Sequence, residues 1–592
     1  MRTRTIAARA VALGGVLVLV GLLPWLSGRD PALSLLRARS AEQEPTEEAL
    51  AAIRDQLGLA SGPLAHLAGW FADLARADLG TSWVSGAEVL PSVLTGLGVS
   101  LTLMGAALLV ALLVAAALCL PALARGARGV PPAGAGVGGG AASLTALPEF
   151  LLATLLMLGL AVWLDWLPPY GWTGPEHLVL PALALGVPAG GLLGRLVGDA
   201  LPAVYRERWV GLWLASGCSP SRVARAALRR TLPAVLPQFG LVAVGLTGGA
   251  VAVESVFAVP GIGRTALGAA ESQDLPLLQG SVLALVLLGT AAGTLAAGAR
   301  RWLLGPALRD AALQLPPAPA TTPSRAALAA TAACGVTLLA AIGWGLTLDP
   351  LTVDTAARLA GPSWAHPLGT DALGRDVLAR VGHGAAATVG VAALIATASY
   401  LVAVALGFLP SVTAGAAEVA NAVPPVISGI LVAAAAGPSV AGASLAVALV
   451  SWPPLATHAA ALVQETRAAA HLTAQRAIGS TPRWILLRHV LPAVAGPVAR
   501  HAVLRLPGIC LALASLGFLG LGARPPAPEW GLTLSESLPY VERAPLAALA
   551  PAGMLALLAA LAVTLATLVP ALAAGRRRPG LDRATRNEAV PA

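Results

Sequence analysis

The residues of this chain that could do chemistry are few, and none is spaced for catalysis or metal binding. The eight histidines form no HxxxH or HExxH pair, and the cysteines Cys119, Cys218, Cys334 and Cys510 form no CxxC pair. No GxSxG turn presents a serine nucleophile. A phosphate-binding GxxxxGK[ST] loop needs a lysine, and the chain has none. We therefore predict no catalytic residue, no metal site and no cofactor in this chain.

Two arginine-rich stretches, one in each half of the chain, are nearly the same. They read LASGCSPSRVARAALRRTLP (214–233) and RAIGSTPRWILLRHVLP (476–492). Pro220 and Pro482 suit the first turn of a helix, and the following residues are amphipathic. Such a helix can lie on anionic lipid, where each arginine contributes about 1 kcal/mol, or insert into a groove on a partner. Two copies at matching positions favour docking onto a paired partner.

The composition places these stretches in a membrane protein. Hydrophobic residues make up 57% of the chain and charged residues 11%, whereas soluble domains carry about 25% charged residues. The mean hydropathy is +0.77, which excludes a water-soluble fold of this size. The net charge of +9 comes from arginines that lie between apolar runs. That pattern indicates membrane topology and not a nucleic-acid partner.

The apolar runs predict an all-α, polytopic fold of about twelve transmembrane helices, arranged as two six-helix lobes. A helix needs about 20 apolar residues to cross a bilayer. In the first half we expect spans at 8–26, 93–120, 141–164, 177–197, 238–258 and 279–299. In the second half we expect them at 326–347, 386–410, 414–437, 440–463, 495–516 and 547–573. The first span follows three arginines without a small-residue cleavage site, which predicts a retained signal-anchor.

Arginine clusters predict which loops face the cytoplasm. They place there the N-terminus, 121–140, 198–237, 300–325, 464–494 and the tail 576–592, and they leave 27–92, 348–385 and 517–546 outside. Both termini are then cytoplasmic. The proline-rich stretch 306–325 reads as a linker between a first lobe, 1–305, and a second lobe, 326–575.

Three acidic residues lie at the ends of predicted spans. Glu149 and Asp165 are expected at the membrane interface. Glu254 lies at the outer end of a span, where an acid is a functional candidate. A structural hydrogen bond is the favoured interpretation for Glu254, because the turn VPGIG follows it directly.

Longer motifs carry a resemblance to a known family. In the first half they are 55–58 (DQLG), 78–82 (DLGTS), the loop after Gly217 and 254–264 (ESVFAVPGIGR). In the second half they are 366–376 (HPLGTDALGRD), 478–492, 516–522 (LGFLGLG) and the stretch from Pro525 to Gly531. The chain resembles the two inner-membrane permease subunits of a bacterial dipeptide, oligopeptide or nickel ABC importer, joined head to tail.

The resemblance implies a permease that moves peptides or a related small solute, including a nickel chelate, by alternating access. It implies two cytoplasmic ATPase subunits, which use ATP and magnesium, an extracytoplasmic solute-binding protein, and a place in the lipid of the bacterial inner membrane. The ATPase-coupling loops would be 206–233 and 468–492, with Gly217, Ser219, Arg222, Arg225, Leu232, Pro233, Ala474, Gly479, Arg483, Arg488, Leu491 and Pro492. The outer-face motif residues would be Glu254, Pro260, Gly261, Gly263, His366, Gly369, Asp371, Gly374, Arg375, Asp376, Gly520, Gly522 and Trp530.

Two alternatives remain open. The family's coupling glutamate is absent, since Gly211 and Thr473 stand six residues before the loop glycines. That absence motivates a degraded, non-transporting homologue as one alternative. A secondary transporter is the other alternative. Such transporters have charged residues near the middle of the membrane, of which this sequence has very few. The segment 366–385 reads as a turn that feeds an amphipathic helix, either as a structural collar or as a landing surface for the binding protein.

Overall fold

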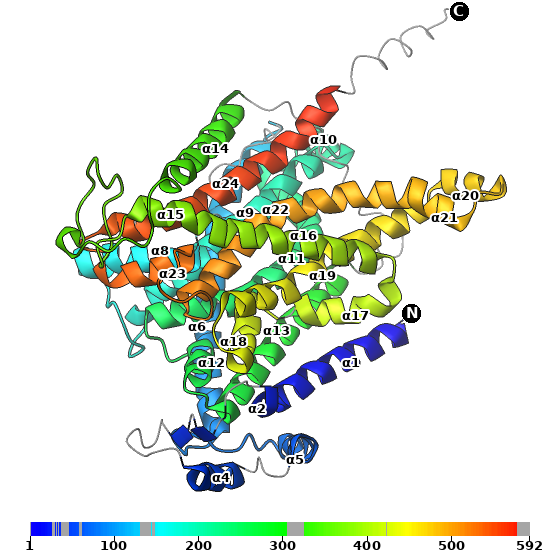
Figure 1. The fold of residues 1–592 in the computed structure, drawn as a ribbon. Helices are drawn as coiled ribbons and strands as arrows, with labels where there is room; N and C mark the ends of the chain where they lie inside the picture. The colour runs from blue at the N-terminus through cyan, green and yellow to red at the C-terminus, as the bar shows by residue number, and fades with distance from the viewer. Residues whose placement is uncertain are drawn as a thin grey trace, which may run out of the picture.

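The computed structural model describes residues 2–26, 30, 32–33, 35–36, 46–57, 62–130, 144, 148–304, 325–421 and 423–576 (Figure 1). These residues are helical apart from turns, and their β pairing amounts to two isolated bridges, Thr81 with Glu88 and Thr370 with Asp376. Each bridge closes a loop directly before a long helix. The all-α expectation is therefore confirmed, while the linker 306–324 and the tail from 577 lie outside the described residues.

The first half supplies short outer helices and long apolar ones. They are α1 (Arg2–Gly21), α2 (Leu23–Leu26), α4 (Glu47–Gln56), α5 (Pro63–Ala75), α6 (Val89–Gly126), α8 (Glu149–Leu156) with a π-helical continuation (Met157–Trp163), α9 (Glu176–Tyr205), α10 (Arg208–Ala215), α11 (Pro220–Val256), α12 (Ile262–Glu271) and α13 (Leu275–Leu304).

The second half repeats this order. It contains α14 (Arg325–Gly345), a 3₁₀ turn (Thr355–Ala357), α15 (Val377–Ala385), a π turn (Ala386–Gly390), α16 (Val391–Gly407), α17 (Pro410–Asn421), α18 (Pro425–Ala436), α19 (Val440–Arg467), α20 (Ala470–Ala477), α21 (Pro482–Ile485), a second π turn (Leu486–Val490), α22 (Leu491–Phe518), α23 (Trp530–Ser537), a 3₁₀ turn (Leu538–Tyr540) and α24 (Pro545–Arg576).

The described residues contain fewer clear membrane spans than the twelve predicted. Eight helices are long and apolar enough to cross a bilayer, and a ninth span results if the bent pair 415–421 and 425–436, with its 91° angle, is counted as one. The predicted spans 8–26, 141–164 and 238–258 do not meet that criterion. The first falls on α1 and α2, the second on the short apolar helix Glu149–Trp163, and the third inside α11, which begins with arginine-rich turns.

A ridge of glycines lets α9 pack closely on α6. Gly186, Gly190 and Gly194 recur at four-residue spacing, and this small-xxx-small pattern allows two helix backbones to approach each other in a membrane. A β carbon at Gly186 would lie 2.6 Å from the carbonyl oxygen of Ala107. Lipid offers no hydrophobic driving force between helices, so van der Waals contact of this kind must hold the pair together.

We predict that Gly190→Ala destabilises the chain by about 1–3 kcal/mol, the usual cost of an overpacked contact. The new β carbon would lie 2.6 Å from Val114 Cβ and 2.7 Å from the carbonyl oxygen of Ala111. Gly105→Ala, on α6, is the matched control because nothing lies within 4 Å of its position. Thermal unfolding in detergent should show a lower Tm for the Gly190 variant alone, and equal Tm values would contradict the packing argument.

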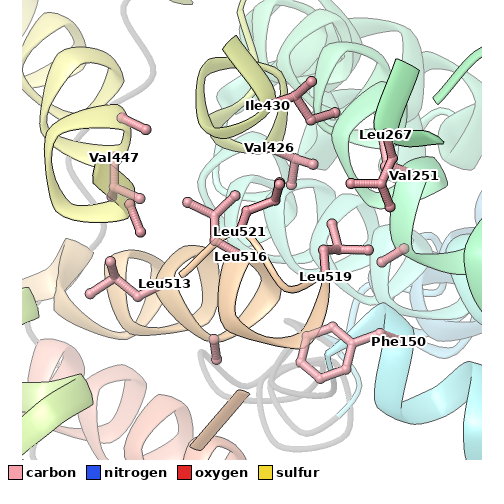
Figure 2. Close-up of a cluster of buried hydrophobic side chains, with 14 of the residues drawn as sticks. Phe150, Val251, Leu267, Val426, Ile430, Val447, Leu513, Leu516, Leu519 and Leu521 are labelled. Carbon is pink, nitrogen blue, oxygen red and sulfur yellow. The ribbon is translucent and has the colours of Figure 1, made fainter. Parts of the chain in front are cut away.

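The two halves share one hydrophobic core. Figure 2 shows Phe150, Val251 and Leu267 of the first half converging on side chains of α18, α19 and α22 of the second half. The Phe150 ring also stacks on Phe518, with 4.9 Å between ring centroids. Helix α1 crosses to the other half as well, since it packs against α17 (Figure 1). The halves are therefore one packed unit and not two lobes joined only by a linker.

The long helices end at two opposite sides of the molecule. Helices α10, α20 and α21 lie at one side, towards which α1 begins and α24 ends (Figure 1). Helices α4 and α5, and the loop that leads into α15, lie at the other side (Figure 1). This grouping agrees with the loop assignment predicted from the arginines. After that prediction, we call the side with α10, α20 and α21 the coupling side and the side with α4 and α5 the outer side.

Candidate functional site

On the coupling side, the two repeated loops have the same backbone. Helices α10 and α20 each end in a Schellman turn, with Gly217 at φ +74° and Gly479 at φ +84°. The N–H groups of Cys218 and Ser480 donate to carbonyls five residues earlier, at 3.0 Å in both loops. A non-glycine residue at this left-handed position costs roughly 1–2 kcal/mol. The shared glycine thus sets the angle between each short helix and the next one.

The helix after each turn begins with a capping residue and a proline. Ser219 precedes Pro220 at the start of α11, and Thr481 precedes Pro482 at the start of α21. The Thr481 hydroxyl accepts a hydrogen bond from the Trp484 N–H at 3.3 Å. This arrangement confirms the expected helix start at both prolines.

The arginine-rich stretch after each proline does not form a helix of its own. The stretch after Pro220 is the first part of α11, which continues unbroken to Val256, and the stretch after Pro482 runs without a break to Phe518. The two Leu-Pro pairs do not mark the end of a helix. Leu232 and Pro233 lie inside α11, and Leu491 and Pro492 lie at the start of α22. The separate short helices are α10 and α20, the segments that precede the glycines.

One buried side chain anchors each short helix to the long helix that follows. In the first half Val210 packs with Val223, and in the second half Leu472 packs with Ile485. Each anchor residue stands seven positions before the loop glycine, and its partner stands six positions after it. The turn and this contact together fix α10 to α11, and α20 to α21 and α22. We call each of these two connected units a lever.

The remaining faces of these levers are solvent-exposed, apolar and basic. Leu212 and Ile478 are 66% and 76% exposed, and Trp484 is also exposed. The side chains of Arg222, Arg225, Arg483 and Arg488 are exposed as well, as is Ala474. In the first half alone, Glu207 accepts from Arg230 Nε at 3.2 Å and from Trp209 Nε1 at 2.7 Å. Large exposed apolar side chains beside arginines form a surface suited to a protein partner.

On the outer side, a buried carboxylate organises the VPGIG turn. Glu254 is fully buried and accepts a hydrogen bond from the Ser100 hydroxyl at 2.5 Å and from the Arg264 N–H at 2.9 Å. The Ser100 oxygen in turn accepts from the Ile262 N–H at 2.9 Å. The N-terminus of α12 is thus capped by an acid on α11 and a hydroxyl on α6. These contacts support the structural interpretation of Glu254.

The second half builds the same cap from different positions. Glu529 accepts from the N–H groups of Gly531 at 2.9 Å and Leu532 at 2.8 Å, and from the Thr388 hydroxyl at 3.1 Å. The Thr388 oxygen accepts from the Trp530 N–H at 3.3 Å. Burial raises the pKa of the Glu529 carboxyl, while these hydrogen bonds favour its charged form. Each half therefore holds a short outer helix, α12 or α23, with a buried acid and a hydroxyl.

Glycines of the motifs make room for these carboxylates. A β carbon at Gly261 would lie 2.2 Å from Glu254 Cδ, and one at Gly517 would lie 2.0 Å from Glu529 Oε2. Gly263 packs against Val251 and the same Glu254 carboxylate. Gly520 has φ +74° and Gly522 packs against Gly517. The glycine-rich strings are therefore built around buried acids, while Pro260 lies exposed in its turn.

The HPLGTDALGRD segment folds on itself. His366 Nδ1 lies 2.8 Å from Asp376 Oδ2, and Asp376 caps α15 by accepting from the Ala379 N–H at 2.8 Å. Gly369 and Gly374 have φ near +77° (+76° and +78°). A β carbon at Gly374 would lie 1.7 Å from the carbonyl oxygen of Asp354, so only glycine fits there. Internal contacts occupy these motif residues and favour the structural collar.

A buried charge cluster fastens this collar to α23. Asp371 accepts from Arg375 Nε at 2.7 Å, and Glu536 accepts from Arg375 Nη2 at 2.9 Å and Arg380 Nη2 at 2.7 Å. Arg380 is fully buried. Trp530, also fully buried, donates from Nε1 to the carbonyl oxygen of Val381 at 2.9 Å. These contacts tie the outer loop, α15 and α23 together.

Between the halves lies a cavity of about 710 Å³. Its walls come from α8 and α11 of the first half and from α17, α18, α19 and α22 of the second half. Along α22 the cavity residues run from Leu504 to Ser515, while the buried residues of the shared core begin at Ile509 and continue past the cavity to Leu521. The core therefore seals the outer side of the cavity, and the cavity lies nearer the coupling side.

Sequence reasoning misplaced or missed several residues of this region. Glu149 was expected at the membrane interface, but it lines the cavity beside Gly249, because α8 starts inside the protein. Arg505, which lines the same cavity, was not singled out. An arginine inside the apolar run 495–516 was the available signal for it. No feature of the sequence pointed to Ser100, Thr388 and Glu529 as capping residues, since each cap depends on contacts between distant helices.

Comparison with known proteins adds the family context. The family model described as "Binding-protein-dependent transport system inner membrane component" matches residues 142–305 and 395–575. A putative peptide permease protein of Brucella suis is 32% identical over 226 residues, which are 36% of this chain and 74% of the relative. A di/tripeptide transport system permease protein of Pseudomonas aeruginosa is 32% identical over 238 residues, 38% of this chain and 78% of the relative.

A third similar protein is the metal-staphylopine import system permease protein of Staphylococcus aureus. It is 28% identical over 298 residues, 49% of this chain and 92% of the relative. Each relative therefore corresponds to about one half of this chain, and the family match occurs once in each half. The matched regions are permease domains without an ATPase domain.

Proposed function

Because the chain belongs to the family of binding-protein-dependent transport system inner membrane components and carries two permease domains, we propose that it is the fused permease pair of an ATP-driven importer for peptides or a closely related small solute. The observation that carries the proposal is the repeated lever. Each half presents a short helix on the coupling side, fixed by a Schellman glycine and an apolar anchor to a long helix that reaches the cavity.

The levers connect the surface proposed to bind the ATPase subunits to the wall of the cavity. Ile485, the anchor partner of α20, and Arg505, in the cavity wall, lie on one helix that runs from Pro482 to Phe518. At 1.5 Å per residue they are about 30 Å apart along that helix. A displacement of α20 by a bound ATPase subunit is therefore passed to the cavity wall. The matching lever on α11 contributes Gly245, Gly248 and Gly249 to the opposite wall.

We infer that the coupling side faces the cytoplasm, with both termini there, as the arginine distribution predicts. The cavity is then sealed towards the outside by the core around Phe150, Leu516 and Leu519 (Figure 2). ATP binding by two partner subunits would draw α10 and α20 together and part that core. A solute-binding protein docked on the outer side would release its cargo into the cavity, and ATP hydrolysis would restore the sealed state.

Docking in this chain does not use the glutamate that the family places before the loop glycine. We propose that exposed apolar side chains such as Leu212 and Ile478, together with the surrounding arginines, supply the contact in its place. The relatives described as peptide permeases favour peptides as cargo. The relative described as a metal-staphylopine import permease adds metal chelates as a second class of cargo.

The test is recovery of ATPase subunits with the full chain from its native membrane in mild detergent. We expect both subunits with wild type, and a loss of roughly tenfold or more in the double variant Gly217→Val and Gly479→Val, because β-branched residues resist the left-handed backbone. Gly86→Val is the matched control: Gly86 also has a left-handed backbone, at φ +72°, with nothing within 4 Å, but it lies in the loop before α6, away from α10 and α20. Failure to recover any ATPase subunit with wild type would overturn the proposal.

A further inference from the structure

The walls of the interlobe cavity carry two charged side chains, one from each half. Of the described residues that line it, Glu149 on α8 and Arg505 on α22 are the charged ones. Most of the remaining wall is small or apolar, and its uncharged polar residues are Asn421, Ser451, Thr457 and Ser515. The cavity therefore presents one fixed anion and one fixed cation within an otherwise weakly polar space.

Neither charge is balanced by another charged side chain among the described residues, although Glu149 lies in the first turn of α8, where the helix dipole favours an acid. Within the described part of the chain, no ion pair within 4.0 Å joins Glu149 or Arg505 to another charged side chain. This contrasts with the outer charge cluster, where Arg375 and Arg380 are bound to Asp371 and Glu536. An unpaired charge inside a membrane protein costs about 2.5–3.5 kcal/mol on insertion scales. Side chains that carry this cost while facing a cavity point to a ligand of opposite charge.

The position of the two residues narrows the chemistry of that ligand. Glu149 lies against Gly249 of α11, with 3.5 Å between the Glu149 Cδ and the place of a β carbon on that glycine. Arg505 lies on the opposite half, on the lever formed by α20, α21 and α22. A ligand that meets both must carry a cation at one end and an anion at the other. The volume of about 710 Å³ falls in the range of small-molecule sites.

Resting on the proposed function, we propose that Glu149 and Arg505 form a cargo site for a zwitterion, an unblocked short peptide with a free ammonium and a free carboxylate. Glu149 accepts hydrogen bonds from the ammonium group, and Arg505 donates to the carboxylate, an ion pair for which the guanidinium fork is well suited. Because the two residues belong to different halves, their separation changes as the levers move. The site therefore holds the peptide in one state of the permease and loosens it in another.

The experiment uses proteoliposomes that contain the full chain with its ATPase subunits and binding protein. Two quantities are measured: uptake of labelled trialanine, and the ATPase rate stimulated by the binding protein. N-acetyl-trialanine amide, which lacks both charges, is the comparison solute. The variants are Glu149→Gln, Arg505→Gln and Arg505→Lys. The controls are Arg500→Gln, on the same helix, and Glu176→Gln; both residues are exposed, and neither lines the cavity.

We expect each glutamine variant to lower trialanine uptake roughly tenfold, the effect of losing one charge-assisted hydrogen bond. The stimulated ATPase rate should stay within about twofold, and the controls should behave as wild type. Arg505→Lys keeps the charge but loses the fork, so it should lose less uptake than Arg505→Gln. The preference for trialanine over the blocked peptide should fall in the glutamine variants. Because the binding protein is the same throughout, a changed preference reports on the permease.

Three results would overturn the inference. Wild-type uptake in Glu149→Gln and Arg505→Gln would show that the charges do not meet the cargo. Parallel loss of uptake and stimulated ATPase would show a structural role. A wild-type complex with intact stimulated ATPase but no trialanine uptake would exclude a simple zwitterionic peptide while leaving the permease proposal standing. Failure of the proposed function looks different, since then no ATPase subunit assembles with the chain.

Discussion

Replacing Glu536 by alanine should destabilise the chain by about 3 kcal/mol, the lower end of the cost of breaking a buried ion pair, because Asp371 alone would then neutralise both Arg375 and Arg380. Glu536 accepts from Arg375 and from the fully buried Arg380. Arg380 would keep the Thr533 hydroxyl at 3.2 Å and Asp371 at 3.7 Å, while its Nε and Nη1 atoms already have no hydrogen-bond partner. Thermal or denaturant unfolding of the purified chain in detergent measures the effect.

A double-mutant cycle separates the charge effect from loss of packing. Removing both partners, with Arg380→Met and Glu536→Met, should cost less than Glu536→Met alone, because Asp371 then has only Arg375 to neutralise. Glu542→Ala is the control, since Glu542 is exposed and its loss should change stability by no more than about 0.5 kcal/mol. Equal effects of Glu536→Ala and Glu542→Ala would refute the role assigned to the cluster.

The second large effect concerns the twin caps. Glu254→Ala should open the N-terminus of α12, and Glu529→Ala that of α23, at about 3 kcal/mol each. In each case backbone N–H groups and a buried hydroxyl lose a charged acceptor. Hydrogen exchange should speed up in α12 for the first variant and in α23 for the second. The effects should be local because the two caps share no residue.

Two controls sharpen this prediction. Glu254→Gln and Glu529→Gln keep one carbonyl acceptor and should lose less than half as much stability as the alanine variants. Glu271→Ala removes an exposed acid from the end of α12 and should leave exchange unchanged. If exchange in α12 and α23 were unaffected by loss of either buried acid, the caps would not be what positions these helices.

The sequence by itself determined the class of this protein and its duplication. Apolar runs of bilayer length, with arginines between them, require a membrane protein of helices, because lipid leaves no other way to satisfy the backbone. The turns at Gly217 and Gly479 could also be predicted from the sequence, since a Schellman turn depends on residues that are neighbours in the chain. Local signals of this kind, together with the motif strings, were enough to predict a fused pair of permeases.

Only the tertiary structure decided which residues meet. The helical continuity of α11 past Pro233 was not readable from the sequence, because packing against α9 and α13 outweighs the cost of an internal proline. Glu254 and Glu529 stand at different distances from the helices they cap, so no shared spacing linked them. Glu149 and Arg505 belong to different halves, and their common cavity exists only when α8 and α22 are packed together. Contacts between distant segments depend on the whole fold, and they were what placed the charged side chains in the path.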